Sequence, residues 1–171
     1  MRRVTCWTCV LLAAAITLGC ERTQSQSTLT TNYKAEDITG ELDFWHGLAD
    51  RPIVSNNEMA HGLVELANRT DPSETYDQRI AWLKSKGYLD SGFDGAADAS
   101  AERGTVAQIL CRVLNIKGGL TMRLIGAHPR YALRELVYME IMPDSSPQQG
   151  LSGIEFVGII NKAEAYTENQ L

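Results

Sequence analysis

Few residues that could carry out chemistry have the spacing of a catalytic or metal site. The three histidines are far apart in the sequence: His46, His61 and His128. A zinc site groups Cys and His at short spacings, and a calcium loop places carboxylates at alternate residues. The acidic loop of this chain instead has carboxylates at every fourth position: Asp90, Asp94 and Asp98. No two carboxylates stand out as an acid and base pair, so we expect no enzymatic activity, metal or cofactor.

Cys20 is the residue with the clearest chemistry. It follows a basic start and the short apolar run Val10–Leu18, with Gly19 directly before it. As a helix this run reaches only ~14 Å, against ~30 Å of hydrocarbon, so it predicts a cleaved signal and not a membrane span. The segment Ile16-Thr17-Leu18-Gly19-Cys20 resembles the lipobox of bacterial lipoproteins. The resemblance implies removal of residues 1–19 and lipidation of Cys20.

Two locations are compatible with this signal. The resemblance implies a lipid-anchored protein of the cell envelope, and Glu21, where inner-membrane lipoproteins often carry Asp, favours the outer membrane. The alternative is ordinary secretion to the periplasm or beyond, with cleavage nearby. Cys6 and Cys9 leave with the signal, so Cys111 is the only free thiol, and its apolar surroundings predict a buried packing residue.

The charge of the mature chain narrows the class of partner. Without residues 1–19 the chain has 14 basic and 21 acidic residues, which gives 14 − 21 = −7. A chain this acidic, with no basic run, is not expected to bind nucleic acid or to dock electrostatically on anionic lipid. We therefore expect its membrane contact to come through the N-terminal lipid.

The chain divides into a tether and one helical domain. Residues 20–39 are polar and rich in Ser, Thr and Gln, which predicts a flexible tether. Residues 40–166 have helical periodicity, with helix stops at Gly87, Gly118-Gly119 and Pro143, and residues 167–171 form a tail. We predict an all-α domain of six or so short helices, with Leu120–Ile125 as the ambiguous stretch.

Three segments of the domain share one pattern. When Glu58, Thr105 and Glu155 are aligned, the spacings are 47 and 50 residues, in the range of repeat architectures. The apolar positions then coincide, with Met59, Val106 and Phe156 equivalent. Ser55 and Ser152 each precede a glutamate by three residues, the spacing of a reciprocal helix cap. Helix capping is therefore the first role expected of Glu58 and Glu155.

Each striped helix is preceded by another helix, so each unit is a helix–loop–helix hairpin. A hairpin this small cannot bury its own apolar face, but three can if their striped helices meet. We therefore predict a pseudo-threefold bundle in which Met59, Val106 and Phe156 share a central axis.

The pattern resembles the S-layer homology (SLH) domain, a bundle of three such hairpins. The resemblance rests on Trp82–Leu89 and Glu102–Leu110 in the second unit and on Tyr138–Pro143 and Leu151–Phe156 in the third. In family members that bind cell-wall polysaccharide, the arginine of a Thr-Arg-Ala-Glu motif meets a ligand carboxylate. The equivalent positions here are Asn56, Arg103 and Gly153, so only the second unit keeps the arginine.

The resemblance implies a non-catalytic module that binds an envelope polysaccharide and links it to the membrane. Its groove residues would be Arg103 with Glu58 and Glu155, aided by Trp45 or Trp82 stacking on a sugar. Both tryptophans could instead be packing residues. Because Asn56 and Gly153 depart from the motif, the alternative is an envelope protein-interaction module that binds no carbohydrate.

A second cluster of cations lies outside the SLH-like motifs. Arg130 and Arg134 are one helical turn apart and lie near Arg123 in the sequence. They could form a local anion site, or they could belong to a solvated face neutralised by Glu135 and Glu140.

Overall fold

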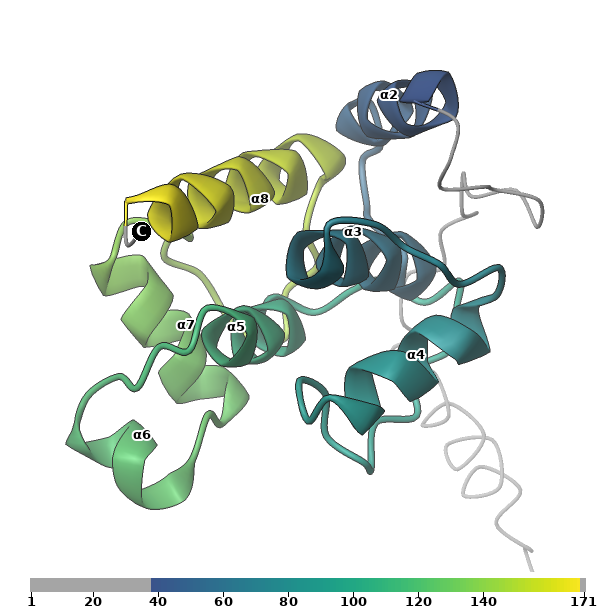
Figure 1. Cartoon of the computed structure of the whole chain (residues 1–171). Coiled ribbons are helices and arrows are strands. Elements are labelled where there is room, and N and C mark those ends of the chain that lie inside the picture. The colour runs from purple at the N-terminus through teal and green to yellow at the C-terminus, as the bar shows by residue number, and fades with distance from the viewer. Residues whose placement is uncertain (1–37, 170–171) are drawn as a thin grey trace, which may run out of the picture.

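The computed structural model describes residues 38–169, and this part of the chain is all-helical with no strand. The all-α prediction is therefore confirmed. The described residues form seven helices, one more than the six or so expected, and Figure 1 shows their arrangement. In chain order they are α2 (Ile38–Ala49), α3 (Asn56–Asn68), α4 (Tyr76–Ser85), α5 (Arg103–Val113), α6 (Leu120–Ile125), α7 (Pro129–Tyr138) and α8 (Gly153–Glu168). The predicted signal (1–19), the lipidated Cys20 and the tether up to residue 37 lie outside the described residues.

The domain boundaries differ slightly from those expected. Helix α2 begins at Ile38, two residues before the predicted start of the domain, and α8 continues to Glu168, two residues past its predicted end. No Gly or Pro stops α8 after residue 166, and Tyr166 still packs against the core. The ambiguous stretch Leu120–Ile125 is a helix that begins directly after Gly118-Gly119.

Local capping begins α3 and α8, as the sequence predicts. Ser55 donates its backbone N–H to Glu58 Oε2 at 2.7 Å, and Glu58 donates its own N–H to the Ser55 hydroxyl at 3.2 Å. Ser152 likewise donates to Glu155 Oε2 at 3.0 Å. Each box satisfies two backbone donors that a helix start leaves unpaired, so both capping predictions are confirmed.

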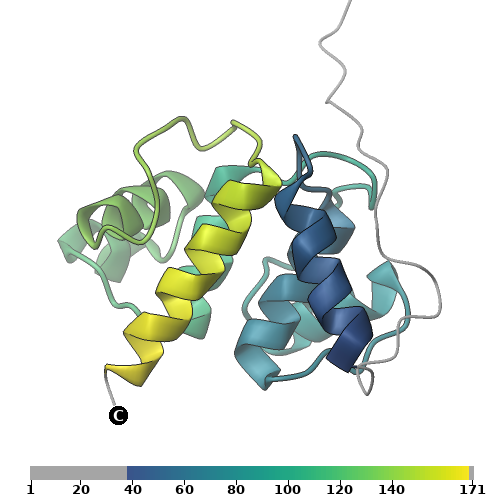
Figure 2. The ribbon, with the colours of Figure 1, turned by 90° about the horizontal axis from the view of Figure 1, so that it is seen from above.

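The described helices share one hydrophobic core. Met59, Val106 and Phe156 are fully buried members of the same cluster. Helix α3 contacts α4, α5 and α8, while α7 packs on α5 and α2 packs on α8. In Figure 2 α2 and α8 run side by side, with α5 behind α8. Residues far apart in sequence thus form a single apolar interior.

Backbone hydrogen bonds tie together the loops that precede α3, α5 and α8. The buried residues Val54, Ala101 and Leu151 each stand one residue before the N-cap of one of these helices. Ala101 donates to the Val54 carbonyl at 2.9 Å, and Val54 donates to the Leu151 carbonyl at 2.8 Å. These bonds hold the N-terminal ends of the three helices close to one another.

The first residue of each of these helices makes the same kind of bond. Its backbone N–H donates to a carbonyl in a loop that precedes another of the three helices, at 2.8 to 3.0 Å. The pairs are Asn56 with Ala99, Arg103 with Gln149, and Gly153 with Arg51. Because the first donors of a helix lack intrahelical partners, these contacts also satisfy the helix starts.

Cys111 lies in the seam between α5 and α7. Its Sγ is 3.8 Å from the Ala132 carbonyl oxygen, and the residue is buried. Burial, together with the charge of Glu135, raises the pKa of the thiol to about 12. The thiol is thus protonated at neutral pH and acts as a small packing residue, which confirms the prediction for Cys111.

Between residues 38 and 169 the structure contains no helix with the length and apolar character needed to cross a bilayer.

Candidate ligand-binding site

Arg103 and Glu155, two of the predicted ligand residues, are brought together. Arg103 Nη2 lies 2.6 Å from Glu155 Oε1, and its Nε donates to the Gly150 carbonyl at 3.2 Å. Arg103 is only 3% exposed. Burial alone would raise the pKa of Glu155, but the hydrogen bonds from Arg103 and Ser152 outweigh it and lower the pKa. This pair joins α5 to α8, so its charges are largely used within the fold.

Glu58 is turned inward. Its side chain has no exposed surface, and its carboxylate is held by the Ser55 cap and by Arg51 Nε at 3.8 Å. The structure therefore gives Glu58 a capping role and no surface that faces solvent.

The two motif positions that lack arginine are filled by the chain itself. A Cβ atom on Gly153 would lie 1.6 Å from the Leu48 carbonyl oxygen, so the end of α2 occupies the space of a side chain there. At Asn56 the side-chain amide donates to the Ala96 carbonyl at 2.8 Å. At both positions that lack the motif arginine, the residue is thus in contact with another segment of the chain: the end of α2 at Gly153, and the loop before α5 at Asn56.

The two tryptophans lie in different places. Trp45 is on α2, where its ring stacks on Phe156 at a centroid distance of 6.4 Å. Trp82 is on α4, beside Tyr88 and under the ammonium group of Lys86. Neither lines a described cavity with Arg103, so the five predicted ligand residues do not form one site.

The largest described cavity, of about 790 Å³, lies beside α7. One wall is α7 with the residue before it, a second is the loop 143–148, and Glu102, the N-cap of α5, also lines the cavity. The lining residues are Glu102, His128, Pro129, Arg130, Leu133, Arg134, Val137, Tyr138, Asp144, Ser145, Pro147 and Gln148. We call this the α7 cavity. The sequence singles out Arg130 and Arg134 but not the walls around them.

Arg130 and Arg134 are the main positive charges of the α7 cavity. Both are exposed, and within residues 38–169 neither guanidinium forms a hydrogen bond or ion pair. Glu135 Oε2 instead accepts from the Gly119 N–H at 3.3 Å, and Glu140 lines a different cavity. Both arginines therefore lie on a solvated face, as the sequence allowed, but neither forms an ion pair with Glu135 or Glu140, so both are open to an anionic ligand.

The remaining groups suit a hydroxyl-rich ligand. Tyr138 is 85% exposed and lines the cavity, so its ring is open to stacking. Glu102 and Asp144 contribute carboxylate acceptors, and Ser145 and Gln148 contribute neutral donors and acceptors. The cavity thus combines groups for an anion, for hydroxyl groups and for the apolar face of a ring.

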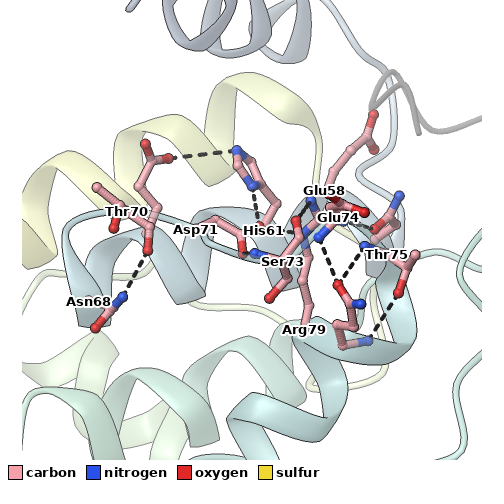
Figure 3. Close-up of polar contacts among 12 residues, drawn as sticks. Glu58, His61, Asn68, Thr70, Asp71, Ser73, Glu74, Thr75 and Arg79 are labelled. Carbon is pink, nitrogen blue, oxygen red and sulfur yellow. Dashed lines mark hydrogen bonds and ion pairs between the residues drawn. The ribbon is translucent and has the colours of Figure 1, made fainter. Parts of the chain in front are cut away.

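A buried polar cluster that the sequence did not suggest joins α3 to α4. His61 Nδ1 donates to Asp71 Oδ2 at 2.7 Å, and Arg79 Nε donates to the same oxygen. Arg79 also donates to the Ser73 carbonyl at 2.9 Å and to Asn57 Oδ1 at 3.1 Å (Figure 3). Burial favours a higher pKa for Asp71, but hydrogen bonds from His61 and Arg79 outweigh it and lower the pKa. The cluster is closed to solvent and holds the two helices together.

Glu65, one turn after His61, gives a prediction for pH. Burial and the neighbouring carboxyl of Glu41 raise the pKa of Glu65 from 4.5 to about 8. As pH rises, Glu65 loses its proton at a lower pH in the unfolded chain than in the folded chain. The free energy of unfolding should therefore fall as pH rises from about 4.5 to about 8 and then level off. Glu65→Gln should gain stability relative to the parent chain across that range. Urea unfolding at several pH values tests this, and a constant difference would contradict it.

No protein-family model matches this chain, and neither a curated protein nor a solved structure does so.

Proposed function

We propose that this chain is a non-catalytic lipoprotein of the bacterial cell envelope whose helical domain binds an envelope polysaccharide in the α7 cavity. Lipid on Cys20 would hold the protein at a membrane, and the pattern of the signal favours the outer membrane. The domain would be a diverged SLH-like module in which three hairpins contribute α3, α5 and α8. Envelope polysaccharide and membrane would thereby be linked through one chain.

The observation that carries the proposal is that two neighbouring arginines of the α7 cavity form no ion pair with another described residue. Arg130 and Arg134 are one turn apart on α7, and both line a cavity that is also lined by the exposed Tyr138. Guanidinium groups bind carboxylate or phosphate through two parallel hydrogen bonds, and an aromatic ring stacks on a sugar face. A polysaccharide with anionic substituents matches both groups.

The SLH-like part of the proposal is supported by the loop contacts. The aligned residues Asn56, Arg103 and Gly153 all donate their backbone N–H to a loop that precedes another of the central helices. The ligand residues differ from those that the family motif implies, because Arg103 is buried and paired with Glu155. We therefore place the ligand in the α7 cavity, next to the start of α5.

The alternative, a protein-interaction module, is favoured by one observation on α6. Leu120 and Leu124 are one turn apart and are 74% and 77% exposed. Exposed leucines that are adjacent on a helix suit an apolar contact with another protein. This surface is distinct from the α7 cavity, so separate variants test the two functions.

The polysaccharide proposal predicts co-sedimentation with insoluble envelope polysaccharide through the arginine pair. The chain from Cys20 onward, carrying Cys20→Ser, should sediment with the polysaccharide. The double variant Arg130→Gln/Arg134→Gln should bind at least about 100-fold more weakly, since it loses two charge-assisted hydrogen-bonding groups. A binding isotherm from the sedimented fraction measures the difference.

The matched control is Lys117→Gln/Arg123→Gln, which removes the same charge outside the cavity. It should bind like the parent chain. Equal weakening of both double variants would indicate unspecific charge attraction. Protease-sensitive binding lost on Leu120→Asp/Leu124→Asp would instead favour the protein-interaction module.

A further inference from the structure

A second cavity, of about 550 Å³, lies where the C-terminal ends of the three central helices meet. Its lining includes Leu66 and Ala67 of α3, Val113 of α5 with the C-cap Leu114, and Thr167 and Glu168 of α8. None of its lining residues belongs to the α7 cavity. We call it the C-terminal cavity.

The walls of the C-terminal cavity combine polar groups, which make up the larger share of its exposed lining, with aliphatic and aromatic side chains. Val157 and Ile160 of α8 add aliphatic surface, and Trp45 and Tyr88 add two aromatic rings. The volume of this cavity is within the range of small-molecule sites, and its hydrocarbon side chains lie beside charged groups. Aromatic faces also attract cations, most strongly where water is excluded.

The charge of the C-terminal cavity is negative. Its carboxylate residues are Glu41, Glu65, Glu164 and Glu168, against the single cation Arg69. The last turns of three helices also direct the negative ends of their dipoles toward it. One carboxylate oxygen, Glu65 Oε2, is buried, has no hydrogen-bond partner among the described residues, and lies 3.9 Å from His61 Nε2. A positively charged hydrogen-bond donor would complete this arrangement.

The carboxylates are not arranged for a metal ion. Within residues 38–169 no three metal-ligating side chains converge on a common point. Negative charge that is spread over the walls, next to aliphatic and aromatic surface, instead suits a cation with a hydrocarbon body.

We propose that the C-terminal cavity binds an organic ammonium ion, with its charge held by Glu65 and Glu41 and its hydrocarbon against Trp45 and the aliphatic wall. The site goes beyond the polysaccharide proposal and does not depend on it. The ligand class is an alkylammonium group, whether it is carried by a free amine or by a larger molecule.

Protonation of Glu65 makes this site sensitive to pH. Burial, then the hydrogen bond and charge of Glu41, raise the pKa of Glu65 to about 8, although the Trp45 indole acts in the opposite direction. At neutral pH the Glu65 carboxyl therefore holds a proton that an ammonium ion would replace. The other titratable or charged groups around Glu65 and the cavity are His61, Asp71, Arg69, Tyr88, Glu164 and Glu168.

The test is titration of the full chain, carrying Cys20→Ser, with n-butylammonium chloride, followed by the NMR signal of the Trp45 indole. Binding should strengthen up to about tenfold per pH unit between about pH 6 and pH 8 and then level off, as the proton on Glu65 is lost. An alkylamine stays charged over this range, as lysine does. The neutral analogue n-butanol should bind more weakly than n-butylammonium at about pH 8 and should show no pH dependence.

Variants separate this site from unspecific attraction by an acidic chain. Glu65→Gln should remove the pH dependence and weaken binding at about pH 9 by about tenfold. Glu164→Gln changes an exposed residue on α8 and should also weaken binding, which keeps the test decisive if Glu65→Gln does not fold. The control Asp98→Asn removes one charge from an exposed loop and should bind normally. Equal binding of n-butanol, or an unchanged pH profile in Glu65→Gln, would overturn the proposal.

Discussion

Replacing Arg79 by methionine is expected to lower the free energy of unfolding by about 3–5 kcal/mol, the usual cost of removing one partner of a buried ion pair. The reason is that Asp71 would remain buried without its cationic partner, keeping only the hydrogen bonds from His61 and from the Ser73 backbone N–H. The Ser73 carbonyl and the Asn57 amide oxygen would also lose their donor. Urea unfolding followed by circular dichroism measures the difference.

Acid dependence supplies a second readout of the same variant. Because the folded pKa of Asp71 is below its ordinary value, the ion pair stabilises the fold above the unfolded pKa and is lost as pH falls through the folded one. The gap between the parent chain and Arg79→Met should therefore narrow in acid. The control Arg123→Met, on an exposed side chain of α6, should stay within about 0.5 kcal/mol of the parent. A loss below about 1 kcal/mol in Arg79→Met at neutral pH would show that the cluster does not hold α3 to α4.

Gly153→Ala is expected to destabilise the fold by about 3 kcal/mol, near the upper end of what overpacking usually costs. The added methyl group would meet the Leu48 carbonyl oxygen at 1.6 Å and the Arg51 carbonyl oxygen at 3.2 Å. Both are backbone atoms, so no side chain can turn aside and the end of α2 must move. Gly153→Arg, which introduces the arginine of the SLH motif that this sequence resembles, should be at least as damaging. Thermal unfolding of both variants tests this.

Gly158 provides the control, since it lies in the same helix and a Cβ there would meet nothing within 4 Å. Gly158→Ala should stabilise the chain by about 0.5–1 kcal/mol, because alanine loses less backbone entropy in a helix. If Gly153→Ala were as stable as Gly158→Ala, α2 would not pack against the start of α8 as described.

Features set by nearby residues were predictable from the sequence. The caps at Ser55 and Ser152 depend on a glutamate three residues later, and both form. The apolar periodicity identified the described helices except Leu120–Ile125, which it left ambiguous, and it predicted the burial of Cys111. These depend on spacing along one element, which a sequence displays directly.

Features that depend on contacts between distant segments could not be predicted. Nothing in the local sequence around Gly153 indicates that the end of α2 occupies the space beside it. Likewise, Asp71 contacts His61, ten residues earlier, and Arg79, eight residues later. No periodic pattern in the sequence marks these three residues as a set.

The candidate site shows the same limit. Arg103 and Glu155 were expected in one site and do form an ion pair, but nothing in the sequence indicates that the Arg103 side chain is buried. The α7 cavity requires the loop 143–148 to fold back beside Glu102, which is about forty residues earlier. Arg130 and Arg134 were visible as a cluster, whereas only the structure shows that neither forms an ion pair with another residue between 38 and 169.

The most direct test of the account is to map where envelope polysaccharide touches the chain. Oligosaccharides released from a bacterial envelope would be added to isotope-labelled protein, and the backbone amide shifts recorded by NMR. If the polysaccharide binds in the α7 cavity, the shifts should be concentrated at Arg130, Arg134, Tyr138 and the loop 143–148. Shifts centred on α6, or no shifts at all at saturating oligosaccharide, would contradict it.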